Sequence, residues 1–267
     1  MSTDDFQQFK EFQRKAWAGF VPFELLTTPV AARTVRHAGV TAGQRVLDVA
    51  CGTGVVAVTA ARLGAMVTGF DLTPELLARA RENAAIGALS IDWHEGDAEA
   101  LPFPDASFDV VVSQFGHMFA PRPAVVVSQM LRVLKPGGTL AFATWPPELL
   151  TGRIFQLTAR YLPPFDPPPA PPHQWGDPAV ILDRIGSAVH DVRFDRGCML
   201  TPALTPAHHR AFSERAAGPV RRLTEILAAT DPEKLAAYRR EYDALAAEYF
   251  ADNHIRQDYL LTRATKR

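Results

Sequence analysis

A short apolar run that ends in a glycine-rich turn constrains the fold more than any other part of the sequence. Residues 46–54 read Val-Leu-Asp-Val-Ala-Cys-Gly-Thr-Gly, and a helical pattern follows them. Glycine is needed in such a turn because a side chain would keep a ligand away from the backbone amides. The stretch from Gly52 to Ala57 also satisfies the dinucleotide-binding fingerprint, a motif of low specificity by itself. We expect a buried strand, a ligand-binding turn and a helix.

Short apolar runs alternate with helical patterns through the region around this turn. The expected strands are residues 45–50, 66–71, 91–96, 108–113 and 139–145. Several of them lack polar alternation, as is typical of parallel strands that are buried on both faces. Thr73-Pro74-Glu75 begins one of the intervening helices, and Lys-Pro-Gly-Gly at 135–138 ends another. This order predicts an α/β, doubly wound Rossmann-like sheet with right-handed crossovers.

Three carboxylates follow three successive predicted strands. Asp48 and Asp71 end the first two, and Asp97 follows the third. A carboxylate at Asp48 would repel a pyrophosphate, and it suits a ligand with an ammonium and a sulfonium group, such as S-adenosylmethionine. Asp71 can accept hydrogen bonds from both ribose hydroxyls, and Asp97 can accept one from the adenine amino group. Because the carboxyl ends of parallel strands line the ligand crevice of such sheets, we expect one shared cofactor site.

Four segments resemble the successive motifs of class I S-adenosylmethionine-dependent methyltransferases, in order and in spacing. They are DVACGTG, GFDLTPELLARARENA, GDAEALPFPDASFDVVVS and RVLKPGGTLAFATW, within about residues 45–145. The resemblance is closest to the small-molecule branch that includes the ubiquinone and menaquinone biosynthesis enzymes. One departure is Ala50, which stands where the family's motif has its first glycine. The resemblance implies a seven-stranded sheet with an antiparallel last strand and a helical insertion between the last two strands.

The resemblance also implies a cofactor and the residues that bind it. S-adenosyl-L-methionine would donate the methyl group and leave as S-adenosyl-L-homocysteine. The implied cofactor-binding residues are Asp48, Ala50, Gly52, Thr53, Gly54, Asp71, Leu72, Asp97, Ala98, Ser113 and Gln114. Of these, Leu72 and Ala98 would pack on the adenine. Ser113 and Gln114 would approach the methionine part and the reactive methyl.

The rest of the chain is expected to build the acceptor site within a single methyltransferase domain, residues 1–267. The expected parts are an N-terminal helical lid segment (1–42), a cofactor-binding core (43–146), a proline-rich connection (147–178), a helical insertion forming a substrate cap (200–257) and a final strand (258–267). Seven prolines lie between Pro163 and Pro172, so we expect this connection to be irregular and to stiffen a chamber wall.

Methyl transfer is an in-line displacement, so the protein mainly positions the acceptor and excludes water. An ionisable acceptor such as a phenol also needs a base. His117 follows the fourth strand and has a near-neutral reference pKa, so it is the candidate base. The candidate acceptor-binding residues are Phe115, Phe119, Trp145 and Trp17. Structural roles are the alternative for each of them: a hydrogen-bonded loop histidine and aromatic core packing.

Charge and composition exclude several other classes. Lys and Arg number 28 against 29 Asp and Glu, so no basic surface for nucleic acid is expected. No apolar run approaches the roughly 18 residues of a membrane span, and the polar N-terminus is unlike a signal peptide. Cys51 and Cys198 cannot form a disulfide framework, and metal-binding spacings such as HExxH are absent. We expect a cytoplasmic protein without a metal.

The expected function is methyl transfer from S-adenosylmethionine to a small, largely apolar molecule. Oxygen is the first choice of accepting atom, and nitrogen and carbon remain open, as does a homodimer. One alternative is a nicotinamide-dependent oxidoreductase, against which Asp48 and Asp97 argue. Another is a non-catalytic S-adenosylmethionine-binding protein, which the cofactor carboxylates do not exclude.

Overall fold

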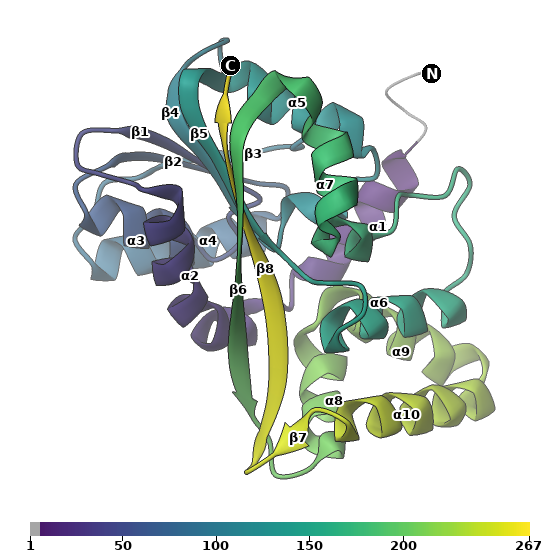
Figure 1. Ribbon diagram of the computed structural model, residues 1–267. Coiled ribbons are helices and arrows are strands. Elements are labelled where there is room, and N and C mark those ends of the chain that lie inside the picture. The colour runs from purple at the N-terminus through teal and green to yellow at the C-terminus, as the bar shows by residue number, and fades with distance from the viewer. Residues whose placement is uncertain (1–5) are drawn as a thin grey trace.

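The computed structural model describes residues 6–267, in which helices cover both faces of a central sheet and further helices form a cap beyond one end of it (Figure 1). The strand order is β3-β2-β1-β4-β5-β8-β6, with β7 paired to β8. The strands are β1 (Arg45–Val49), β2 (Met66–Asp71), β3 (Asp92–Glu95), β4 (Phe108–Gln114), β5 (Leu134–Thr144), β6 (Val189–Pro202), β7 (Phe250–Ala251) and β8 (His254–Lys266). Strands β1 to β5 pair in parallel, and β8 is antiparallel to both β5 and β6. The predicted doubly wound sheet with an antiparallel last strand is confirmed.

The helices form two layers and a cap. They are α1 (Gln7–Trp17), α2 (Glu24–Ala38), α3 (Val55–Arg62), α4 (Pro74–Ile86), α5 (Pro123–Val133), α6 (Leu150–Tyr161), α7 (Pro178–Ile185), α8 (Pro206–Ala216), α9 (Gly218–Thr230) and α10 (Pro232–Ala247). Figure 1 shows α2, α3 and α4 on one side of the sheet and α5 and α7 on the other. Helices α6, α8, α9 and α10 gather beside the far ends of β6 and β8, and α1 lies between this cap and the sheet.

The central strands are apolar at successive positions because both of their faces are buried. On β1, Val46 packs in the core beneath α2 and α3, whereas Leu47 and Val49 pack in the core on the side of α5 and α7. All three side chains are fully buried. On β4, Val110 and Val111 divide between the two cores in the same way. This arrangement explains why the sequence lacks the polar alternation of a half-exposed strand.

The structure divides the N-terminal segment differently from the prediction of a lid over residues 1–42. Helix α2 belongs to the core, because Val30, Ala31 and Val35 are buried against the sheet and α3. Only α1 occupies the position of a lid, with α9 as its most extensive helical neighbour. The first five residues of the predicted lid lie outside the described part of the chain.

The proline-rich connection is not irregular throughout. Helix α6 (Leu150–Tyr161) lies inside the segment 147–178 and contains no proline, because the prolines stand before and after it. Proline disrupts a helix interior but not the residues beyond its ends. The insertion between the last two strands is also shorter than predicted: β6 continues to Pro202 and β8 begins at His254, so the cap helices α8 to α10 occupy residues 206–247.

Candidate functional site

The glycine-rich turn after β1 is tied to the end of β2 by one carboxylate. Gly52 donates its backbone N–H to Asp71 Oδ2 at 2.8 Å, and Thr73 donates its backbone N–H to Oδ1 at 2.8 Å. Gly52 has φ +55, and a Cβ there would meet no atom within 4 Å. Its glycine is therefore required by backbone conformation, and the space beside it is open. Each Asp71 oxygen keeps a further lone pair, as a ribose diol would need.

Ala50 departs from the expected glycine at a position where the backbone is left-handed. Its φ is +54, a conformation that side chains disfavour. Gly116 lies directly against it, because a Cβ on Gly116 would be 2.6 Å from the Ala50 carbonyl oxygen. The absence of a side chain at Gly116 thus allows the loop after β4 to pack directly against the loop after β1. Both residues line the same cavity.

Asp48 is a buried carboxylate at the cavity. Its Oδ2 accepts a hydrogen bond from the Ala57 N–H at 3.0 Å, while Oδ1 has no partner among the described residues. Burial raises the pKa of Asp48 well above its usual value, and burial also raises the pKa of Asp71. An unpartnered carboxylate oxygen in such a place fits a cationic ligand, which would offset the cost of burying the charge.

Asp97 closes the other end of the row of carboxylates. Lys10 of α1 forms an ion pair with Asp97 at 2.5 Å and another with Glu99 at 2.6 Å. Arg122 also binds Glu99, at 2.7 Å. Helix α1 is therefore held across the predicted adenine end of the site.

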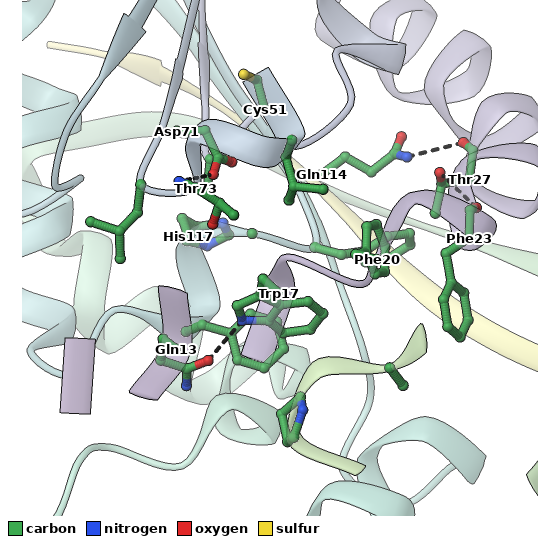
Figure 2. Close-up of a pocket in the computed structure, with 18 of the residues that line it drawn as sticks. Gln13, Trp17, Phe20, Phe23, Thr27, Cys51, Asp71, Thr73, Gln114 and His117 are labelled. Atoms are coloured by element: carbon green, nitrogen blue, oxygen red, sulfur yellow. Dashed lines mark hydrogen bonds between the residues drawn. The ribbon is translucent and has the colours of Figure 1, made fainter. Parts of the chain in front are cut away.

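A single cavity connects these carboxylates with an aromatic chamber under the cap. Of the predicted site residues, it is lined by Asp48, Ala50, Thr53, Asp71, Leu72, Asp97, Ala98, Gln114, Phe115, His117, Phe119, Trp145 and Trp17. Figure 2 shows Trp17 and Phe20 beside the cavity, with the Trp17 indole N–H directed to Gln13. Trp17 packs on Phe119 with ring centroids 4.6 Å apart, and Phe115 stacks on Trp145 at 4.0 Å. The predicted acceptor-binding aromatics are thus brought together.

Three predicted cofactor residues do not line the cavity. Gly54 is required by packing instead, because a Cβ there would be 2.6 Å from the Trp93 ring. Gly52 contributes its N–H to Asp71, as described above. Ser113 is fully buried and accepts the His117 N–H at 3.1 Å, so it supports the loop after β4 from below. Its predicted approach to the methionine part does not fit this position.

Gln114 reaches the cavity, but both ends of its amide are engaged by α2. Its Nε2 donates to the Thr27 carbonyl at 3.0 Å, and its Oε1 accepts from the Thr34 hydroxyl at 3.0 Å (Figure 2 shows the first bond). The side chain therefore fastens α2 to the end of β4, where the resemblance had implied contact with the methionine part.

The role of His117 as a base does not fit its surroundings. The ring packs against Phe142 and Trp175, with centroids 4.7 Å and 4.6 Å away. Both ring nitrogens are buried and have no hydrogen-bond partner among the described residues. Burial lowers the pKa of His117 to about 3, so the ring is neutral and weakly basic. The sequence could not show this because the aromatic neighbours come from β5 and from the segment Pro172–Gly176.

Sequence reasoning missed a polar cluster in the chamber. His209 and Ser213 of α8, Tyr242 of α10 and Gln257 of β8 all line the cavity, and all four are buried. All four lie within the expected helical insertion, residues 200–257, but no motif in that segment singles them out. The alternation of residues along β8 could have placed Gln257 on an inward face, but only the fold brings it to α8.

The part of the chain that the structure describes begins at residue 6. Within it, no group of three or more His, Cys, Asp or Glu side chains is arranged to hold a metal ion. None of its helices is long and apolar enough to cross a membrane.

Comparison with known proteins places this geometry in a family. Residues 47–142 match the family model described as a methyltransferase domain. An uncharacterised protein of Mycobacterium tuberculosis is 36% identical over 246 residues, which cover 91% of this chain and 89% of the relative. A demethylmenaquinone methyltransferase of Deinococcus radiodurans is 42% identical over 118 residues, 43% of this chain and 49% of that protein.

A solved structure shares the fold. The phosphoethanolamine N-methyltransferase 2 of Haemonchus contortus, in complex with S-adenosyl-L-methionine, superimposes with a TM-score of 0.56 at 21% identity. The match covers 89% of this chain and 52% of that one.

Proposed function

The chain belongs to the class I S-adenosylmethionine-dependent methyltransferases, and we propose that it methylates a small, electrically neutral and largely apolar molecule at an oxygen atom. S-adenosyl-L-methionine is the cofactor, and it supplies an activated methyl carbon when bound. Family membership decides against the nicotinamide-dependent alternative. The observation that carries the proposal is the distribution of charge along the single cavity.

All charged side chains that line the described part of the cavity are at its cofactor end. They are Asp48, Asp71, Asp97 and Lys10. The two histidines on the wall, His117 and His209, have pKa values lowered by burial to about 3 and about 4, so both are neutral near pH 7. An acceptor with a charged amine or carboxylate would lose its hydration in the chamber without gaining a counter-ion. This favours a neutral acceptor, and a hydroxyl is the neutral nucleophile of choice.

The chamber walls favour an aromatic or similarly flat apolar acceptor. Trp17, Phe20 and Phe23 reach it from the N-terminal segment. Phe119 packs on Trp17 in a tilted arrangement, and Phe155 meets Phe119 edge to face. Aromatic pairs of this kind prefer stacked or edge-on contacts, which an aromatic acceptor would extend. Helix α1 and the cap would exclude water and hold the acceptor on the axis of displacement.

We also propose a reducing location, the cytoplasm, and a small molecule as partner. Cys51 is buried and Cys198 is exposed, and both are free thiols. An exposed free thiol is compatible with a compartment that keeps cysteines reduced.

The test is transfer of a labelled methyl group. The purified protein would be incubated with S-adenosylmethionine carrying a deuterated methyl and with fractionated metabolite extracts, and the products would be identified by mass spectrometry. We expect label on an oxygen of a neutral, apolar product. Asp48→Asn is the control, because it removes a carboxylate from the cofactor end and should abolish labelling. Label on a charged amine, or no labelled product in spite of tight cofactor binding, would contradict the proposal.

A further inference from the structure

The polar cluster in the chamber forms one directional chain of hydrogen bonds. Gln257 Nε2 lies 2.8 Å from His209 Nε2, and Tyr242 Oη lies 3.2 Å from His209 Nδ1. Tyr242 Oη in turn donates to Ser213 Oγ at 2.9 Å. Since an amide nitrogen only donates, His209 Nε2 must accept and Nδ1 must carry the proton. The order of donation is therefore Gln257 to His209 to Tyr242 to Ser213.

Burial keeps the side chains of this hydrogen-bonded series uncharged. His209 is 2% exposed and Tyr242 is fully buried. Burial lowers the pKa of His209 to about 4 and raises the pKa of Tyr242 far above its usual value. Neither group therefore changes its charge near pH 7, and the direction of the chain is fixed.

Two polar groups of this hydrogen-bonded series remain available to a ligand. The Ser213 hydroxyl accepts from Tyr242, and its own hydrogen has no acceptor among the described residues. The Gln257 Oε1 accepts no hydrogen bond from them, and it is not among the fully enclosed unpartnered atoms. Both residues line the cavity. Within this series of hydrogen bonds, Ser213 thus offers one donor to the cavity and Gln257 offers one acceptor.

A neutral hydroxyl group matches this pair, because a hydroxyl both donates and accepts. A carboxylate could use only the Ser213 donor, and an ammonium only the Gln257 acceptor. We propose that Ser213 and Gln257, oriented by His209 and Tyr242, form a subsite for a neutral hydroxyl group of the acceptor molecule. The identification of that molecule as a methyl acceptor rests on the function proposed above.

The subsite lies away from the cofactor carboxylates. Strand β5 ends at Thr144, which pairs with Leu260 of β8. Gln257 lies beyond this pair, where β8 pairs only with β6, and its partner there is Met199. Gln257 is three positions along β8 from Leu260, which corresponds to about 10 Å. The subsite therefore suits a hydroxyl at one end of the acceptor, and it makes Ser213 and Gln257 specificity-determining residues.

The test compares two probes of the same shape. Binding of 2-naphthol and 2-methylnaphthalene would be measured by calorimetry on the protein saturated with S-adenosyl-L-homocysteine, so that no transfer occurs. The readout is the ratio of the two dissociation constants. A general change in the shape of the chamber would weaken the binding of both probes and would leave this ratio unchanged. We expect Gln257→Met, Ser213→Ala and Tyr242→Phe each to shift this ratio against 2-naphthol by about 3- to 10-fold, as expected for the loss of one hydrogen bond.

Tyr238→Phe is the matched control. Tyr238 lies one turn from Tyr242 on α10 and is equally buried, but its hydroxyl pairs with Thr158 and it does not line the cavity. An unchanged ratio in Ser213→Ala and Gln257→Met, an equal shift in Tyr238→Phe, or no binding of 2-naphthol to the wild-type protein would overturn the subsite. Each variant would also be assayed for S-adenosyl-L-homocysteine affinity, which should stay unchanged. Loss of labelled transfer in the wild type, with the ratio shifts intact, would refute the proposed function and leave the subsite standing.

Discussion

The Nζ atom of Lys10 lies 2.5 Å from Oδ2 of Asp97, so the N-terminal helix is bound to the carboxylate that we expect to hold the adenine amino group. The same lysine binds Glu99, whose side chain is almost completely buried. One side chain thus joins α1 to the loop after β3, so the position of α1 is tied to the predicted adenine end of the site.

Removal of this contact should loosen α1 selectively. In Lys10→Met, the ion pairs to Asp97 and Glu99 are lost while an apolar side chain of similar length remains. We expect faster hydrogen exchange of the backbone amides of α1 and no change in β1, as measured by mass spectrometry. Lys15→Met is the control, because among the described residues the Lys15 ammonium forms its ion pair within the same helix, with Glu11 at 3.1 Å. Equal exchange in the two variants would show that Lys10 does not hold the helix.

Asp71→Asn should weaken cofactor binding. The carboxylate holds the Gly52 and Thr73 amides, and we expect it also to bind the ribose hydroxyls. Loss of charged hydrogen bonds costs about 1–3 kcal/mol, which corresponds to roughly 5- to 150-fold in the dissociation constant of S-adenosylmethionine measured by calorimetry. Asp109→Asn is the control, because Asp109 lies at the start of β4 and the carboxylates of the cofactor site follow the ends of their strands. This variant should bind the cofactor normally. Wild-type affinity in Asp71→Asn would remove the ribose role.

The buried His117 should make the protein sensitive to acid. Its pKa is lowered to about 3 in the folded protein, whereas an unfolded histidine titrates near pH 6.5. The unfolded chain therefore binds more protons below pH 6.5, and stability is lost as the pH falls from there toward 3. At pH 5 this group should cost about 2 kcal/mol relative to neutral pH.

His117→Phe should remove this part of the acid sensitivity. The comparison is the free energy of unfolding in urea at pH 7 and at pH 5, with the exposed-residue variant His190→Gln as control. The difference between the two pH values should be smaller by about 2 kcal/mol in His117→Phe than in the wild type. The same pH dependence in both proteins would mean that the ring is protonated in the folded state, and the base role of His117 would then be open again.

Gly116→Ala should destabilise the protein through a clash. Its added Cβ would lie 2.6 Å from the Ala50 carbonyl oxygen, which is a backbone atom, so one of the two loops would have to shift. Overpacking of this kind costs about 1–3 kcal/mol, to be measured by urea unfolding. Gly137→Ala offers a comparison, since that position has open space and only its φ of +74 disfavours a side chain. A cost for Gly116→Ala no greater than that for Gly137→Ala would show that the two loops can separate.

The cofactor half of the site could be predicted because its determinants are local. Each carboxylate follows its own strand, and parallel strands bring their carboxyl ends to one edge whatever the details of packing. The turn around Gly52 is likewise set by backbone conformation. For the same reason β1 to β4 were predicted to within one residue, whereas β5 begins at Leu134, five residues before the expected start.

The polar part of the acceptor half could not be predicted because its residues come from distant parts of the chain. The near-neutral reference pKa of histidine made His117 a candidate base. In the fold, burial among aromatic side chains from β5 and Pro172–Gly176 lowers its pKa. Gln257 and His209 are 48 residues apart and meet only because the cap folds back on the end of β8. The sequence by itself determined the sheet, the turn and the cofactor. Tertiary packing decided which side chains face the acceptor, since burial and long-range contacts, not local pattern, fix the charge and direction of each polar group.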